Sequence, residues 1–195
     1  MISSDMNTTT EPPAAAEEQS SAEGDPPRTC ADISVEDGRW ISVTGLPELI
    51  PDLVTETLIA CQFAPESRTV SIALLSDPEV RSLNKLFRGK DTATNVLSFP
   101  SAPLPQTTNN LNGPIFIGDV ALAYETVTEE ASAQKKPVLN HAAHLIVHGV
   151  LHLAGFDHGE DAEAQKMETA ERAILNRFGI PDPYADDALP LQTSL

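Results

Sequence analysis

All five histidines of the chain lie between His141 and His158. Three of them form the pattern H-x-x-x-H-x-x-G-x-x-H, in which His148, His152 and His158 are the histidines and Gly155 is the glycine. Residues at i and i+4 of a helix lie one turn apart on the same face, so the first two imidazoles can share one ion. The glycine can adopt a positive φ and return the chain, which brings His158 round as a third ligand. Three nitrogens with one open position are typical of a catalytic zinc site, so we expect one zinc ion per chain.

Two other kinds of zinc site share part of this pattern. A structural site normally has a fourth protein ligand, usually cysteine, and Cys30 and Cys61 are poorly placed in the sequence to supply it. The metzincin proteases share the histidine spacing but carry Glu after the first histidine, where this chain has Gly149. Peptide hydrolysis is therefore disfavoured, although a zinc metallopeptidase-like hydrolase stays open as an alternative.

Other polar residues near the pattern have open roles. His141 and His144 precede the three histidines by one and two turns, and we expect them to pack or to support the ligands. Asp157 can orient a ligand imidazole, act as a base or simply form a turn. Asp119 lies in an apolar segment, where a carboxylate needs a partner, so it can support a histidine or cap the backbone. The sequence does not identify a general base.

A short basic segment lies between Arg81 and Lys90, with four basic residues and no acid. Such a segment is often only the solvated face of a helix. Arg88 and Lys90 are expected in a loop after that helix and before an apolar strand, where functional sites often lie. A guanidinium offers two parallel donors to phosphate oxygens, so Arg88 is a candidate catalytic and substrate-binding residue and Lys90 a second substrate-binding residue.

The overall composition restricts the class of protein. The chain has 195 residues and a net charge of −17, which excludes a globally basic nucleic-acid binder. No apolar run approaches the length of a membrane span, so we expect no membrane partner. Two cysteines cannot build a disulfide framework, and a reducing, cytoplasmic compartment is expected.

Strand and helix patterns alternate along the middle of the chain. Four strands are expected, at 40–43, 68–75, 94–99 and 115–123. Five helices are expected, at 48–63, 76–87, 125–134, 138–154 and 160–178. These elements predict an α+β, sandwich-like fold with a mixed four-stranded sheet packed by about five helices. The expected domain is 33–184, between a disordered acidic extension at 1–32 and a C-terminal tail at 185–195.

Several blocks of this sequence resemble the YbeY family of bacterial rRNA maturation factors. The block HGVLHLAGFDH, which starts at His148, is similar to the zinc signature of that family. Four further blocks resemble family motifs: FRGKD at 87–91, TNVLSFP at 94–100, GDV at 118–120 and DPY at 182–184. The resemblance runs from about Trp40 to Tyr184 and leaves out the acidic N-terminal extension.

The resemblance implies a single-strand-specific, zinc-dependent endoribonuclease that acts in 16S rRNA 3′-end maturation and ribosome quality control. It implies that His148, His152 and His158 are the zinc ligands and that Arg88 is the functional arginine. The implied partners are single-stranded RNA, the 16S rRNA precursor, the small ribosomal subunit and its assembly factors. A non-catalytic ribosome-assembly factor with structural zinc is a further alternative.

Overall fold

The computed structural model describes residues 30–102 and 113–185. Its sheet has four strands, β1 Ala31–Val35, β2 Arg68–Leu75, β3 Val96–Pro100 and β4 Ile115–Ala123. The strand order is β1-β2-β4-β3, with β1, β2 and β4 parallel and β3 antiparallel to β4. The expected mixed four-stranded sheet is therefore confirmed, and β3 is one of its two edges.

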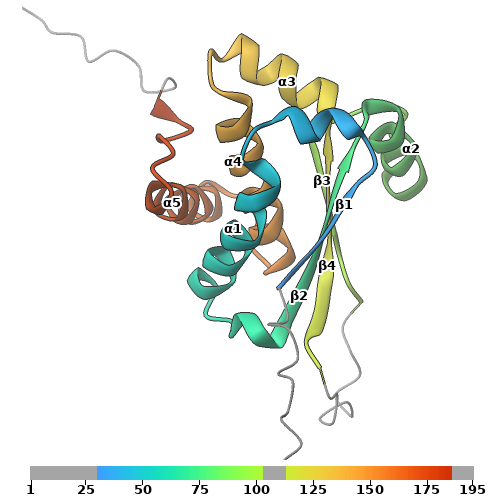
Figure 1. Cartoon of the computed structure of the whole chain (residues 1–195). Helices are drawn as coiled ribbons and strands as arrows, with labels where there is room; N and C mark the ends of the chain where they lie inside the picture. Colours follow the sequence, from blue (N-terminus) through green and yellow to red (C-terminus); the bar gives the residue numbers. More distant parts are fainter. Residues whose placement is uncertain (1–29, 103–112, 186–195) are drawn as a thin grey trace, which may run out of the picture.

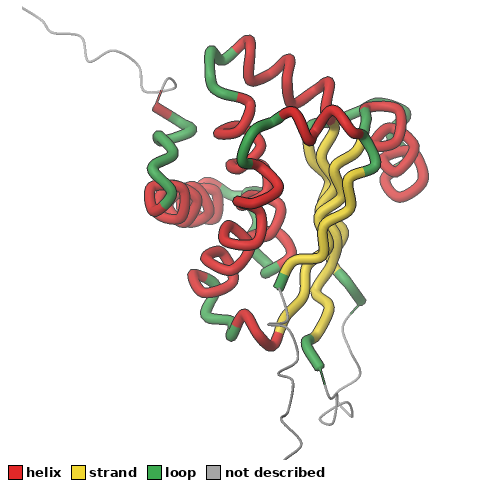
Figure 2. The backbone as a smooth tube through the Cα atoms, viewed as in Figure 1, coloured by secondary structure: helices red, strands yellow, loops and turns green. Residues whose placement is uncertain are grey.

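Helices cover the two faces of the sheet unequally. The described residues form five α-helices: α1 Leu46–Ala60, α2 Asp77–Arg88, α3 Tyr124–Ala133, α4 Val138–Leu153 and α5 Asp161–Arg177. Figure 1 shows α1, α4 and α5 on one side of the sheet and α2 on the other. Figure 2 shows the same division, with the strands between the helical layers. The fold is the expected α+β class.

The helix α4 lies at the centre of the larger core. Its apolar residues are buried on several sides, because it packs against both the sheet and α5. Gly149 permits this close approach, since a Cβ there would lie 2.6 Å from Cγ1 of Val120 and 3.1 Å from Oγ of Ser98. The packing of α4 against β3 and β4 brings its histidines beside the free edge of the sheet.

The other face of the sheet has a smaller core. Side chains alternate along each strand, so Val120 faces α4 while Leu97 and Ala121 pack with Val80 of α2. This second cluster contains only Leu75, Val80, Leu97, Ala121 and Ala123 as fully enclosed members. Among the helices of the described residues, α2 is the one that covers this face (Figure 1).

The prediction of a strand at 40–43 is wrong. Residues Gly38–Ser42 form a 3₁₀ helix, in which Trp40 is fully buried and Ile41 is exposed. Trp40 and Val43 are buried three positions apart, which is helical rather than strand spacing. The indole N–H of Trp40 donates to the carbonyl of Leu75 at 2.9 Å, so the segment closes one end of the sheet. The fourth strand is instead β1, which the sequence pattern did not predict.

Some expectations concern residues outside the described ranges. The disordered extension expected at 1–32 lies there up to residue 29, as do 103–112 of the expected loop and the tail from 186 onward. The expected boundary at 33 is wrong, because residues 31–32 already belong to strand β1, where they pair with β2. No helix among the described residues is long and apolar enough to cross a membrane.

Candidate metal centre

Three histidines meet at the C-terminal end of α4. His148 and His152 lie one turn apart, and their Nε2 atoms are 3.1 Å from each other. The chain then turns at Gly155, whose φ is +95°, and returns His158 to the pair. The ring of His158 lies 5.6 Å from that of His148 and 5.0 Å from that of His152, centroid to centroid. All three residues offer a nitrogen within 4.8 Å of the others, so they can hold a metal ion.

The hydrogen bonds of two rings determine which nitrogens are free. Nδ1–H of His152 donates to the carbonyl of Phe156 at 3.0 Å, and Nδ1–H of His148 donates to Oε1 of Glu171 at 2.8 Å. A carbonyl and a carboxylate only accept hydrogen bonds, so both Nδ1 atoms carry a proton, and in the neutral form of each ring Nε2 carries a lone pair. Two facing lone pairs repel unless a cation lies between them. The spacing is close to the roughly 3.3 Å expected between nitrogens in tetrahedral zinc, so the donor set fits a metal.

A buried carboxylate supports this centre. Glu171 on α5 is fully enclosed, and it accepts hydrogen bonds from Nε2 of His144 at 3.0 Å and from His148. The hydroxyl of Tyr184 donates to the same carboxylate. Although burial raises the pKa of Glu171, these hydrogen bonds lower it to about 2, so the group is ionised at neutral pH. Burial and the bond to Glu171 raise the pKa of Tyr184, which therefore stays protonated and donates.

His144, His148 and Glu171 form a second group with metal-binding geometry. The carboxylate of this group already accepts hydrogen bonds from both histidines. We therefore assign Glu171 as the group that orients His148, an arrangement common around histidine ligands of metals.

The sequence analysis did not identify Glu171 or Tyr184. Met167, Ile174 and Leu175 form the buried stripe of α5, and Glu171 lies on it. A single acid within an apolar stripe is a signal that a buried partner exists, and this signal was available in the sequence.

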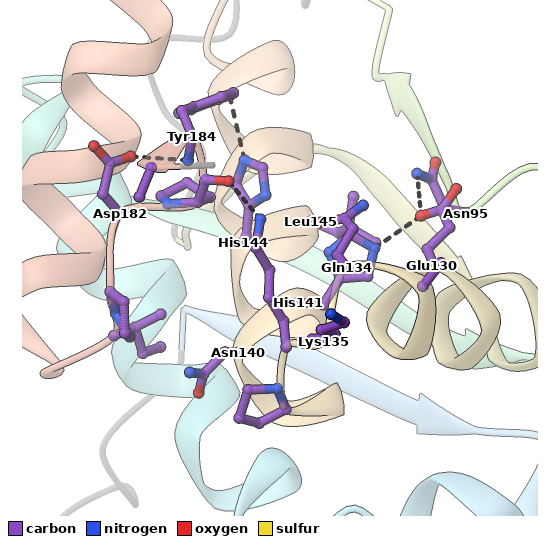
Figure 3. A pocket seen from close by; sticks show the side chains of 17 residues that line it. Asn95, Glu130, Gln134, Lys135, Asn140, His141, His144, Leu145, Asp182 and Tyr184 are labelled. Carbon is purple, nitrogen blue, oxygen red and sulfur yellow. Dashed lines mark hydrogen bonds and ion pairs between the residues drawn. The ribbon is translucent and has the colours of Figure 1, made fainter. Parts of the chain in front are cut away.

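The two other histidines differ in their roles. His144 reaches the centre through Glu171, as expected for a supporting residue. His141 instead bonds to Oε2 of Glu130 at 2.8 Å, and Nδ2 of Asn95 donates to the same oxygen. Figure 3 shows this group and the His144–Tyr184 contact beside a pocket of about 1080 Å³. His141 therefore ties α4 to α3 and to the start of β3, away from the three-histidine group.

A cleft of about 550 Å³ lies over the three histidines and reaches Arg88. Its wall includes Ser98 and Pro100 of the edge strand β3. Arg88 donates from Nη2 to the carbonyl of Ser98 at 3.2 Å, which holds its guanidinium at the edge of the sheet. Burial lowers the pKa of His152, which favours the neutral form of this ring that binds a metal.

The expected loop position of Arg88 is wrong, because this residue is the last of α2. Gly89 then ends the helix with a φ of +69°. Lys90 follows as an exposed residue and is not part of the cleft wall. Of the two basic residues predicted for phosphate binding, the structure brings only Arg88 to the histidines.

The two aspartates also occupy different surroundings. Asp157 lines the cleft, and its Oδ1 accepts a hydrogen bond from the backbone N–H of His158 at 2.7 Å, as a turn residue does. Asp119 is adjacent to Val120, which faces α4, so strand alternation directs Asp119 to the opposite face. It therefore does not support a histidine of α4.

The chain is similar to known proteins over most of its length. The model of the family described as Endoribonuclease YbeY matches residues 33–179. The chain is 44% identical over 160 residues to Endoribonuclease YbeY of Sinorhizobium fredii, which covers 79% of this chain and 91% of that protein. It is 46% identical over 155 residues to the protein of the same name from Azorhizobium caulinodans, covering 79% of this chain and 95% of that protein.

Among solved structures, the fold is similar to the solution structure of TM1509 from Thermotoga maritima. The two have a TM-score of 0.50 and 21% sequence identity, and the match covers 84% of this chain and 99% of that one. This likeness supports the α+β fold of the chain.

Proposed function

The chain belongs to the Endoribonuclease YbeY family, and from this membership we propose that it is a zinc-dependent endoribonuclease specific for single-stranded RNA. The family name supports a hydrolase that acts on RNA. The metal, the strand specificity and the roles of individual residues are our proposals for this chain.

The observation that carries the proposal is the approach of the Nε2 atoms of His148 and His152, which face each other at 3.1 Å with His158 beside them. We assign these three residues as the ligands of one zinc ion, because three imidazoles and an open position suit zinc in a catalytic role. A zinc ion held there supplies Lewis-acid chemistry to a phosphodiester.

The proposed task of Arg88 is to hold the phosphate that is cleaved. Its guanidinium lines the cleft together with the three histidines, and a planar donor pair matches two phosphate oxygens. Its hydrogen bond to Ser98 limits the positions it can adopt. Lys90 stays a proposed contact to the RNA beyond the cleft, because an exposed ammonium can reach a neighbouring phosphate.

The metallopeptidase alternative is less well supported. Gly149, where the metzincins carry their glutamate, packs directly on Val120 and Ser98. A glutamate at this position would point into the sheet instead of into the cleft. The ligand set has no cysteine and no fourth protein ligand, which also disfavours a purely structural zinc site.

We propose that the RNA substrate is the 16S rRNA precursor, and that the protein acts in 3′-end maturation and in ribosome quality control. The proposed partners are the small ribosomal subunit and its assembly factors, and the proposed location is the cytoplasm. The family match at residues 33–179 supports a single catalytic domain, which we propose to begin with β1 at Ala31 and to end at 184.

One experiment separates the three functions. The purified protein is incubated with single-stranded RNA, double-stranded RNA and casein, with and without a chelator. The proposal expects cleavage of single-stranded RNA only, and loss of this cleavage with the chelator. Cleavage of casein would support the metallopeptidase, and RNA binding without cleavage would support the assembly factor.

A further inference from the structure

We propose that Phe87 and Phe99 form a platform on which a base of the single-stranded RNA stacks beside the cleft. The inference deepens the proposed function, because it names a contact that selects unpaired RNA. Bases of a single strand can leave their own stack and lie against aromatic rings, whereas paired bases cannot.

The last turn of α2 exposes apolar surface that nothing in the described residues covers. Phe87 is 63% exposed and Leu86 is 74% exposed, although both end a helix whose inner face is well packed. The ring of Phe87 lies 5.0 Å from that of Phe99, centroid to centroid, at an interplanar angle of 55°. Phe99 is half-buried against the smaller core, so it holds the more exposed ring of Phe87 in place.

Arg88 links this aromatic pair to the cleft over the histidines. Phe99 itself packs with the smaller core, on the opposite face of β3 from Ser98 and Pro100, which line the cleft. The guanidinium carbon of Arg88 is 6.0 Å from the ring centroid of Phe99, and Arg88 lines the same cleft. A phosphate held by Arg88 therefore has its neighbouring base within reach of the pair.

Charge alone explains RNA binding poorly in this protein. The chain carries a net charge of −17, and Asp91 already pairs with both Arg81 and Lys85 of α2. Within the described residues, no carboxylate pairs with Arg88 or Lys90, so only two of the four positive charges of this segment are left for the RNA. Stacking on an aromatic ring does not depend on net charge, and it suits every base. This is why we assign RNA, and not a protein partner, to this surface.

The test measures RNA affinity with the full chain and a fluorescently labelled oligoadenylate of about 12 nucleotides, long enough for a single-strand site. The variants are Phe87→Ala, Phe87→Leu and Phe87→Trp, with Leu86→Ala as the matched control. RNA length is checked after each titration, and the melting temperature of each variant is measured. Phe87→Leu keeps apolar area but removes the ring, so it separates stacking from general hydrophobic contact.

We expect Phe87→Ala and Phe87→Leu to weaken binding by about 10-fold, the scale of one lost base stack. Phe87→Trp and Leu86→Ala should bind as the wild type does. Wild-type affinity in Phe87→Leu would overturn the proposal, and so would an equal loss in Leu86→Ala, which would show general apolar contact in place of stacking on the ring. If the wild type cleaves RNA while Phe87→Ala binds normally, only this inference fails. If the wild type neither binds nor cleaves RNA, the proposed function fails with it.

Discussion

Glu171 of α5 accepts a hydrogen bond from Nδ1 of His148 of α4 at 2.8 Å, although the two residues are 23 positions apart in the chain. The carboxylate is fully buried and ionised, and its second oxygen is occupied by His144 and Tyr184. The ring of His148 is thereby held with Nε2 toward His152. The orientation of one proposed zinc ligand thus depends on a residue from another helix.

Glu171→Gln should lower zinc affinity by about 10- to 100-fold. The amide NH2 group of glutamine replaces one of the two accepting oxygens, so the hydrogen bonds that orient His148 are weakened. The measurement is competition with a chromogenic chelator. Glu168→Gln is the control, since Glu168 lies one turn earlier and pairs at the surface with Arg172. Equal affinity in the wild type and in Glu171→Gln would show that His148 does not need this carboxylate.

His152→Ala should remove most of the zinc from the purified protein. His144→Ala should lower zinc affinity less, because His144 acts only through Glu171. His141→Ala should keep one zinc ion per chain, since its partner is Glu130 and it does not touch the three-histidine group. Metal analysis of the three variants checks this order, and stoichiometric zinc in His152→Ala would refute the ligand assignment.

The stability of the metal-free protein should fall at acidic pH through Glu171. Its pKa is lowered from 4.5 to about 2 in the folded state. A lowered carboxyl pKa stabilises the fold above the unfolded-state value, and this stabilisation is lost as pH falls from about 4.5 toward 2. Urea unfolding at pH 7, 5 and 3 should show this loss in the wild type and a smaller one in Glu171→Gln. Parallel pH profiles would contradict the role of Glu171.

Gly149→Glu should not create a peptidase. A side chain at this position meets Val120 at 2.6 Å, so even Gly149→Ala should lower the free energy of unfolding by about 1–3 kcal/mol, as overpacking does. Gly38→Ala is the control, because nothing lies within 4 Å of the added carbon. Thermal melting and a casein assay test both statements, and a stable, casein-cleaving Gly149→Glu protein would reverse our interpretation of the helix face.

Arg88→Ala should reduce the turnover of single-stranded RNA more than its binding, because the guanidinium acts where charge develops on the phosphate. Arg88→Lys should restore little, since an ammonium cannot make two parallel hydrogen bonds. Zinc content and melting temperature should stay close to the wild type, because Arg88 is exposed. Arg68→Ala is the control, from the first residue of β2. Loss of zinc or of folding in Arg88→Ala would make it a structural residue.

The sequence alone was sufficient for features that depend on neighbouring residues. Helical pitch puts His148 and His152 on one face, and Gly155 allows the turn to His158, so this group follows from a segment of 11 residues. The bounds of β2 and β4 were also predicted correctly, because β-branched and apolar residues fill both strands.

Only the tertiary structure decided which distant residues complete the site. β1 has only five residues, Ala31–Val35, too few for its alternation of apolar and polar residues to be a strong signal, and its pairing with β2 makes it a strand of the sheet. Glu171 reaches His148 because α5 packs on α4, and Arg88 reaches the cleft because α2 ends beside the edge strand β3. These contacts join helices and strands far apart in the chain, and no local periodicity encodes such distances. The packing of the two hydrophobic cores determines these contacts, because the position of each helix depends on how all the apolar faces fit together.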